Sequence, residues 1–247
     1  MNIVKIPREL IYNKSLTDKR VAIYSYCTLH SGISNSCYTS CSTIISWCGM
    51  KMDRHPGSTN DKFSETLKLM QDSGYISNFS QDTFKNAYTI IEMMINREKF
   101  FPTSKFAVIT QEEIDLIRNA KFSSRKINAP ILLLVLSYVR SNIIKRTEEN
   151  TVETQPECFY RYINTIEQEL GISSTFILLA LNELKSLNII KHKQLPKYKV
   201  AGKWKNNVTL FVNATGEEGY NYEEELKYGE RMVNRSKYMM EVRKNAV

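Results

Sequence analysis

An internal repeat restricts the fold of this chain more than any other feature of its sequence. The segment Ile23-Tyr-Ser-Tyr26 near the N-terminus returns as Val135-Leu-Ser-Tyr138 in the second half. Farther along each half, Gly74-Tyr75-Ile76 corresponds to Asn188-Ile189-Ile190. The two copies of this segment are separated by almost the same number of residues as the two copies of the first segment. A repeat of this length indicates two similar domains rather than one large core. A chain of 247 residues is long enough for two such domains.

Each copy of the repeat predicts three helices, of which the third is amphipathic. Phe63, Leu67 and Met70 recur at helical spacing in the first copy, and Ile177, Leu181 and Leu184 take the same places in the second. Glycine follows several of the expected helices, and glycine at this position favours the end of a helix. The predicted helices are 18–31, 42–48 and 58–73 in the first copy, and 131–144, 157–170 and a helix from residue 175 in the second.

Strands follow the third helix of each copy. Alternating apolar residues predict strands at 75–79 in the first copy, and at 189–193 and 207–213 in the second. Residues 88–95 are compatible with either a returning strand or a short helix. A strand at 106–110 and a helix at 111–119 complete the first copy. This order predicts a mainly α fold with small β-hairpins, of the α+β class, arranged as two tandem winged helix-turn-helix domains.

The expected domain organisation follows from the repeat. We predict a first winged-helix domain at 1–120, a polar connector at 121–128, a second winged-helix domain at 129–215 and a charged helical tail at 216–247. Apolar residues at loosely helical spacing in the tail leave two interpretations open. The tail is either a helix that binds a partner or a second copy of the chain, or a terminal helix packed on its own domain.

The distribution of charge singles out one hairpin. The chain has 34 Lys and Arg against 26 Asp and Glu, a net charge of +8. Between Lys185 and Lys205, on the expected second wing, lysines occur without any Asp or Glu. Such a hairpin favours contact with the phosphates of nucleic acid, although lysines that protect an edge strand from aggregation are the alternative. The candidate contacts are Lys191, Lys193, Lys197, Lys199, Lys203 and Lys205.

The start of each third helix supplies further candidates, because a helix-turn-helix unit inserts this end into the major groove. Short hydroxyl side chains suit phosphate or mixed base contacts, but one of them has to cap the helix. Asparagine can pair with adenine, and arginine with guanine or phosphate; the asparagine could equally serve as a cap. The candidates are Ser173, Ser174 and Thr175 in the second copy, and Arg54, His55, Ser58, Thr59, Asn60 and Lys62 in the first.

Motifs for catalysis are missing from the sequence. It has no phosphate-binding glycine loop, no dinucleotide-binding glycine motif and no zinc-protease motif, and its three histidines are far apart. The five cysteines include no Cys-x-x-Cys pair, so we expect buried thiols rather than a metal site. We therefore predict no catalytic residue, no metal and no cofactor, and a protein that is not an enzyme.

The N-terminal residues carry a resemblance to a known family. Val4-Lys-Ile-Pro-Arg-Glu-Leu10, followed by residues 15–26, resembles the start of the winged-helix domain of plasmid and phage replication initiators, of the replication initiator protein A N-terminal type. The resemblance covers roughly residues 3–80 by motif and the remainder by architecture. It implies binding to repeated origin DNA and recruitment of host replication proteins. The loop at 51–57 is longer than the usual turn and departs from the family pattern.

Taken together, these features predict a cytoplasmic protein that binds double-stranded DNA in a sequence-specific manner. The longest apolar run, at 129–139, is too short for a membrane-spanning helix, which needs about 20 residues, so no membrane is expected as a partner. Host replication proteins and a second copy of the chain are further candidate partners. The alternatives are a winged-helix transcriptional regulator and, in another class, a protein-interaction adaptor that has lost its affinity for DNA.

Overall fold

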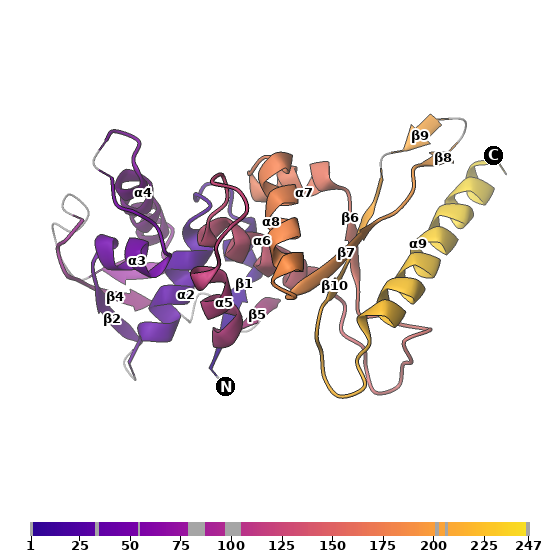
Figure 1. Ribbon diagram of the computed structural model, residues 1–247, viewed down its shortest axis with the longest axis horizontal. Helices are drawn as coiled ribbons and strands as arrows, with labels where there is room; N and C mark the ends of the chain where they lie inside the picture. The colour runs from indigo at the N-terminus through magenta and orange to yellow at the C-terminus, as the bar shows by residue number, and fades with distance from the viewer. Residues whose placement is uncertain are drawn as a thin grey trace. The chain divides into compact units, whose positions relative to one another are not determined.

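The structure is a computed structural model that describes residues 2–32, 35–53, 55–78, 87–96, 105–200, 203–205 and 207–245; for 198–200, 203–205 and 238–245 it describes the backbone alone. The protein belongs to the α+β class, and its strands form small antiparallel sheets (Figure 1). Contacts divide the chain into two units, residues 1–141 with 170–172, and residues 142–169 with 173–247. The expected connector at 121–128 lies inside the first unit.

The first unit opens with a strand and a short helix, and the predicted helices follow in order. Ser40 and Ser58 cap α3 and α4, each by accepting a hydrogen bond from a backbone N–H of the first turn. The elements are β1 (Ile3–Pro7), α1 (Arg8–Tyr12), α2 (Arg20–His30), β2 (Ser36–Thr39), α3 (Cys41–Trp47), α4 (Thr59–Asp72), β3 (Ile76–Asn78), β4 (Ile91–Ile95), β5 (Phe106–Thr110), α5 (Gln111–Asn119) and α6 (Ala129–Asn142).

Two small sheets organise the first unit. Strand β4 lies between β2 and β3 in an antiparallel sheet, with Cys37 opposite Met93 and Ile76 opposite Ile95. Along β4, buried residues alternate with half-exposed ones, so one face of this sheet meets the core. The other sheet pairs β1 with β5, and α5 follows β5 directly through a capping box in which Thr110 and Glu113 exchange hydrogen bonds.

Helix α6 corresponds to the helix that the sequence predicted at 131–144 and contains the longest apolar run of the chain. Every residue from Ala129 to Val139 is buried. At its end, Arg140 forms an ion pair with Glu113 and donates a hydrogen bond to the carbonyl oxygen of Val108 at 3.0 Å. These contacts tie α6 to α5 and β5 of the first unit. None of the described helices combines the length and the apolar character that a membrane crossing requires.

The second unit contains a three-stranded sheet that extends into a hairpin. Strand β10 lies between β6 and β7, and all pairs are antiparallel. Beyond this sheet, the N–H of Leu195 donates to the carbonyl oxygen of Val208 at 2.8 Å, and β8 and β9 form the outer end of the hairpin. The elements are β6 (Phe159–Arg161), α7 (Ile163–Leu170), α8 (Ser174–Ser186), β7 (Ile190–Gln194), β8 (Tyr198–Val200), β9 (Lys203–Lys205), β10 (Thr209–Asn213) and α9 (Tyr222–Asn245).

The two units repeat one order of elements. In chain order, β2, α3, α4, β3 and β4 correspond to β6, α7, α8, β7 and β10, and the sheet orders β2-β4-β3 and β6-β10-β7 match. The backbone turns match as well. Gly49 after α3 and Gly171 after α7 have φ of 67° and 73°, and Gly74 after α4 and Asn188 after α8 have φ of 70° and 56°. Positive φ at matched positions supports the repeat inferred from the sequence.

At several points the structure forms a strand that the sequence did not predict or left open. The helix expected at 157–170 begins only at Ile163, because Phe159–Arg161 pair with β10 as strand β6. Strand β2 was not predicted; its four residues are held by pairing with β4, a contact that is distant in the sequence. Residues 88–95, which were compatible with strand or helix, contain strand β4 at Ile91–Ile95.

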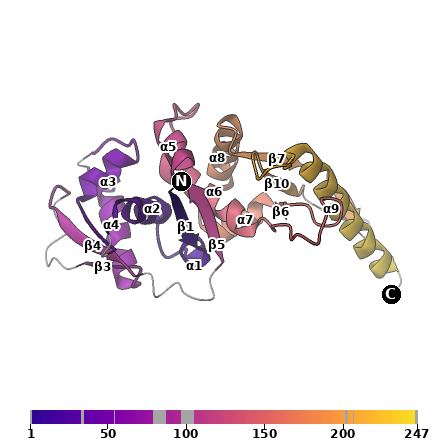
Figure 2. The ribbon, with the colours of Figure 1, turned by 90° about the horizontal axis from the view of Figure 1, so that it is seen from below.

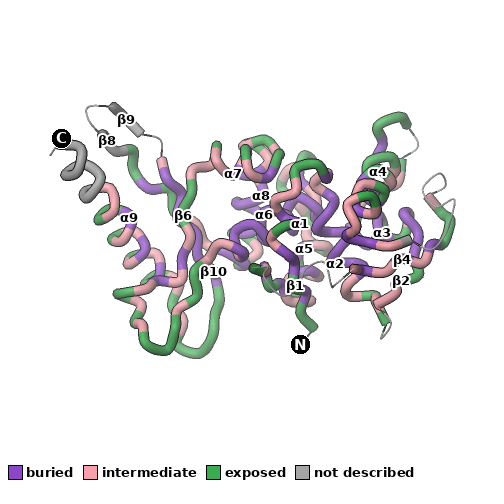
Figure 3. Tube along the Cα trace, turned by 180° about the vertical axis from the view of Figure 1, so that it is seen from behind, coloured by how far each residue is buried: buried purple, intermediate pink, exposed green. Residues whose placement is uncertain are grey.

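Helix α9 packs against the sheet of its own unit, as one of the two interpretations of the tail expected (Figures 2 and 3). Tyr222, Leu226 and Met232 of α9 cover a buried cluster formed by Cys158, Leu210 and Val212. Strand β10 is consequently buried on both faces, unlike β4 in the first unit. The tail is therefore part of the second unit's core rather than a separate extension.

Candidate nucleic-acid interface

The N-terminus of α8 presents polar side chains at the surface. Gly171, with its positive φ, makes the turn from α7, and Ser173 occupies the N-cap position. The side chain of Ser173 makes no capping hydrogen bond. Ser173 and Thr175 are exposed and Ser174 is half-buried. These three predicted residues therefore stand beside backbone N–H groups of the first helical turn, an arrangement that favours anions.

The exposed face of α8 continues from Thr175 along the helix. Leu178, Asn182 and Lys185 follow at helical spacing, and all are exposed. The single acidic residue of α8, Glu183, is buried, so this face carries no negative charge. Asn182 and Lys185 were not among the predicted contacts. Their positions seven and ten residues after Thr175 were the sequence signal that could have identified them.

The lysine-rich hairpin extends from the same unit. In Figure 1, the first turn of α8 and the β8–β9 end of the hairpin both lie on the upper side of the second unit. Lys197 is exposed at the approach to β8. Lys199 pairs with Trp204 across the two strands, Lys203 pairs with Val200 and Lys205 pairs with Tyr198. The segment predicted as a loop thus contains a regular antiparallel pair.

Two of the predicted lysines contact α9 instead of projecting freely. The Lys193 ammonium forms an ion pair with Glu230 at 2.6 Å. The Lys191 ammonium lies 5.3 Å from the centroid of the Tyr222 ring, a cation–π contact. Both lysines belong to β7, at the base of the hairpin. Helix α9 therefore competes with any phosphate for these two cations, whereas the hairpin beyond Leu195 lies outside these contacts.

The corresponding helix of the first unit has a different surface. The exposed side chains of α4 include Asp61, Glu65 and Asp72 as well as Lys62 and Lys68, so charges of both signs alternate on this face. The carboxylate of Asp53 accepts a hydrogen bond from the N–H of Thr59 at 2.6 Å. A second carboxylate, that of Asp61, accepts from the N–H of Gly57 at 2.8 Å. Two acids thus already occupy the N-terminus of α4, where a phosphate would bind.

The predicted residues of the first unit are brought together only in part. His55 is exposed in the loop before α4, Thr59 is half-buried in its first turn and Lys62 is exposed. The Ser58 hydroxyl is buried and caps the helix by accepting from the N–H of Asp61 at 3.2 Å. The Oδ1 atom of Asn60 is buried, whereas pairing with adenine needs this atom at the surface. Arg54 lies outside the described residues.

The remaining chemistry of the chain is consistent with a protein held together by apolar contacts. All five cysteines are free thiols and buried, as the sequence analysis expected. Burial raises the pKa of the Cys48 thiol and of the Cys158 thiol to about 12, so neither is a nucleophile at neutral pH. Within the described residues, no group of three or more His, Cys, Asp or Glu could hold a metal ion.

Comparison with known proteins does not assign the chain to a family. No protein-family model matches the sequence, and no curated protein matches it.

Proposed function

We propose that the protein binds double-stranded DNA in a sequence-specific manner through two tandem winged helix-turn-helix domains, and that the second unit provides the main contacts. The matched sheet orders β2-β4-β3 and β6-β10-β7 support the repeated domain. In each unit two consecutive helices precede the two strands of a hairpin, which is the order of a winged helix-turn-helix. The second unit then uses α8 for the major groove and the hairpin for the backbone.

One observation carries the proposal: the second unit combines an acid-free exposed face on α8 with an adjoining hairpin that is rich in lysine. DNA repels carboxylates and attracts lysines, and each neutralised phosphate releases counterions. Thr175 and Asn182 supply hydrogen-bonding groups on the same face, and hydrogen bonds of this kind distinguish bases. The face of α4 has the same position in its unit but carries exposed acids, so we assign it a supporting role.

Within this function, we propose that the protein is a replication initiator of a plasmid, phage or other mobile element. The resemblance of residues 4–26 to such initiators supports this assignment. Initiators bind direct repeats, whereas a dimeric transcriptional regulator binds a palindrome that mirrors its two-fold symmetry. Selection of bound sequences from randomised duplexes, followed by sequencing, tests the assignment. Selection of direct repeats would support the assignment as an initiator. Selection of a single palindrome would indicate a transcriptional regulator instead.

The DNA proposal is tested by reversing the charge of the hairpin. Lys197, Lys199, Lys203 and Lys205 are changed together to Glu, and the affinity for the selected duplex is measured by fluorescence anisotropy at several salt concentrations. We expect the affinity to fall by at least about 100-fold at low salt. The slope of log affinity against log salt should flatten by about 0.9 for each phosphate that the variant no longer neutralises.

A matched control distinguishes the effect of where the charges lie from the effect of the net charge on affinity. Lys121, Arg125, Lys126 and Lys145 are exposed and lie outside the hairpin, so changing them together to Glu alters the net charge equally. This control should lose much less affinity than the hairpin variant. Equal losses in the two variants, or a wild-type chain that binds no duplex at low salt, would contradict the proposal and favour a protein-interaction adaptor.

A further inference from the structure

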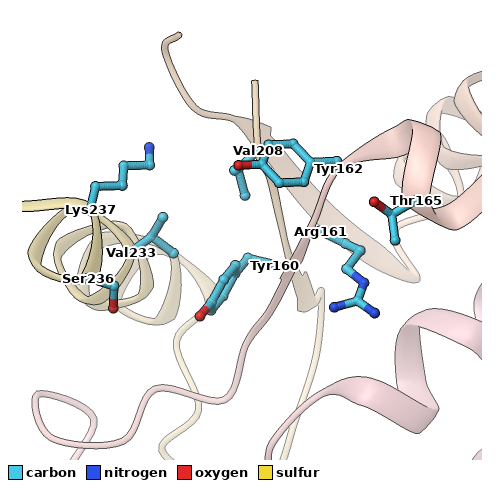
Figure 4. Close-up of a pocket in the computed structure, with 8 residues that line it drawn as sticks. All are labelled: Tyr160, Arg161, Tyr162, Thr165, Val208, Val233, Ser236 and Lys237. Atoms are coloured by element: carbon cyan, nitrogen blue, oxygen red, sulfur yellow. The ribbon is translucent and has the colours of Figure 1, made fainter. Parts of the chain in front are cut away.

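A small pocket opens in the second unit between β6 and α9, away from α8. Its volume is about 190 Å³. The walls are formed by Tyr160 and Arg161 of β6, by Tyr162 directly after it, by Thr165 and Val208, and by Val233, Ser236 and Lys237 of α9 (Figure 4). Val208 belongs to the chain that returns from the lysine-rich hairpin, since its carbonyl oxygen accepts from the N–H of Leu195. None of the residues lining the pocket is among those proposed to contact duplex DNA.

Both tyrosines reach the pocket. Tyr160 in β6 and Tyr162 directly after the strand project toward α9, as Figure 4 shows. Arg161 also lines the pocket, but its guanidinium is directed away from α9 and forms an ion pair with Glu169. Tyr160 remains 41% exposed. Its ring is thus a wall of the pocket that a ligand can reach, rather than part of the core.

The size of the pocket restricts its occupant. An apolar cavity of about 150 Å³ is large enough for benzene, and sites for drug-sized ligands span about 300–1,000 Å³. The volume of about 190 Å³ therefore fits one aromatic ring system and excludes a folded peptide segment. Because the pocket opens to solvent beside Tyr160, the remainder of a larger molecule could extend outward from it.

The chemistry of the walls favours a planar ring with an attached anion. Tyrosine rings stack on the faces of nucleobases whatever their sequence, and a neighbouring ammonium attracts the phosphate. Lys237 provides that ammonium at the rim, and none of the residues lining the pocket is acidic. Burial lowers the pKa of Lys237, and the charge of the neighbouring Glu230 carboxylate opposes this shift. The Lys237 ammonium also donates a hydrogen bond to Oδ1 of Asn234 at 3.5 Å.

We propose that the pocket formed by Tyr160, Tyr162 and Lys237 binds a single unpaired nucleobase, with the adjoining phosphate at Lys237. Either an unpaired nucleic-acid strand or a free mononucleotide can supply this group. The tyrosines provide stacking and Lys237 provides charge, so the pocket does not read the identity of the base. The proposal does not depend on duplex binding, since the pocket shares no residue with the surface proposed for duplex DNA.

The test measures binding of a labelled single-stranded oligothymidylate to the full chain by fluorescence anisotropy, with thymidine monophosphate as competitor. We expect Tyr160→Leu to weaken binding roughly 5- to 150-fold, the range for removal of one stacked base. Tyr160→Phe keeps the ring and should retain nearly the wild-type affinity. Lys237→Gln should flatten the salt dependence by about 0.7, the value for one phosphate on a single strand.

A matched control comes from the first unit. Tyr38 lies on β2, the strand that corresponds to β6, and is 70% exposed, so Tyr38→Leu removes an even more accessible ring outside the pocket. Its affinity for the oligonucleotide should equal that of the wild type. Circular dichroism and thermal unfolding verify that each variant is folded; Tyr160→Phe and Lys237→Gln provide the comparison if Tyr160→Leu does not fold.

The outcomes are distinct. Competition by the mononucleotide at similar affinity would identify the free nucleotide as the ligand, and preference for the oligonucleotide would identify a strand; both support the pocket. The proposal is overturned if neither ligand binds, if Tyr160→Leu and Tyr38→Leu bind as the wild type does, or if an aromatic peptide binds and nucleotides do not. Loss of duplex binding with retained oligonucleotide binding would refute only the proposed function.

Discussion

A single buried guanidinium organises the start of the first unit. Arg20 is 1% exposed and donates hydrogen bonds to five backbone carbonyl oxygens. They lie in α1, in the loop that follows it, and at Leu170, which belongs to the same unit. Burial lowers the pKa of Arg20 to about 10, so the side chain stays charged at neutral pH. The acceptors belong to Leu10, Ile11, Leu16, Thr17 and Leu170.

Replacing Arg20 should destabilise the folded protein. Arg20→Met keeps an apolar side chain of similar length but leaves several buried carbonyl groups without a donor, each worth about 1–3 kcal/mol. We expect the free energy of unfolding to fall by about 3 kcal/mol, measured by urea denaturation. Arg125→Met, at an exposed arginine, is the control and should change it by less than about 0.5 kcal/mol. Similar losses in both variants would contradict this role of Arg20.

His192 gives the second unit a dependence on pH. Burial, together with the charge of Lys185, lowers the pKa of His192 below the ordinary value of 6.5. The unfolded chain therefore takes up a proton near pH 6.5 before the folded one does, so stability is complete above this pH and declines as pH falls below it. Urea denaturation between pH 7.5 and 5.5 should show a larger decline for the wild type than for His192→Gln. Parallel curves would refute this assignment.

Among the elements, helix α9 determines which residues of its sheet are buried. Glu225 is buried and accepts a hydrogen bond from the N–H of Glu157 at 2.6 Å, and it also pairs with Arg146. At Gly229 the helix approaches closely: an added Cβ atom would lie 3.0 Å from the Sγ atom of Cys158 and 3.2 Å from Leu210. These contacts explain why α9 covers Leu210 and Val212, which a free-standing hairpin would expose.

A bulky residue at this point of contact should loosen α9. Gly229→Val forces two extra methyl groups against Cys158 and Leu210, and overpacking of this kind costs about 1–3 kcal/mol. We expect lower stability in urea and faster reaction of the Cys158 thiol with a disulfide reagent. Lys227→Val, at an exposed position of the same helix, is the control. If both variants protect Cys158 as the wild type does, the helix does not depend on close packing at residue 229.

The ion pair between α9 and β7 should restrain DNA binding. Glu230→Gln releases Lys193 from its carboxylate, so one more cation becomes available to a phosphate. We expect tighter binding of the selected duplex at low salt and a salt slope steeper by about 0.9. Glu224→Gln removes the same charge from an exposed position of α9 and controls for net charge. Equal effects of the two variants would show that Lys193 does not reach a phosphate.

Over the whole molecule, the two units share one order of elements but differ in the charge of their exposed side chains. Asn182 of α8 corresponds in the repeat to Lys68 of α4, and Thr175 corresponds to Asp61. The second unit presents neutral side chains at these two positions, whereas the first presents a lysine and an acid. Duplicated architecture therefore does not require duplicated function, and we expect the two units to contribute differently to DNA binding.

Substitutions at matched positions test this asymmetry. Asn182→Ala should weaken binding of the selected duplex by about 1–3 kcal/mol and relax the base preference at one position, as expected when a side chain that reads a base is removed. Lys68→Ala, its counterpart, should change the affinity little and leave the preference intact. Selection from randomised duplexes with each variant measures both effects. A larger loss of preference with Lys68→Ala would assign base recognition to the first unit.

The sequence alone determined the repeated order of helices, many of the helix ends and the apolar positions of the amphipathic helices. Phe63, Leu67 and Met70, and likewise Ile177, Leu181 and Leu184, are buried as their spacing predicted, and α5 has the predicted bounds. These features are local: helical spacing, caps and positive φ depend on residues within a few positions of one another. The fold class, α+β, was predicted for the same reason.

Only the tertiary structure decided which residues face solvent and which strands pair. Strands β2 and β6 are short, and they exist because β4 and β10 pair with them from far along the chain. The burial of the Asn60 oxygen, the contacts of Lys191 and Lys193 with α9, and the pocket beside Tyr160 likewise arise between distant segments. Sequence periodicity does not encode such contacts, because they depend on how separate elements pack together.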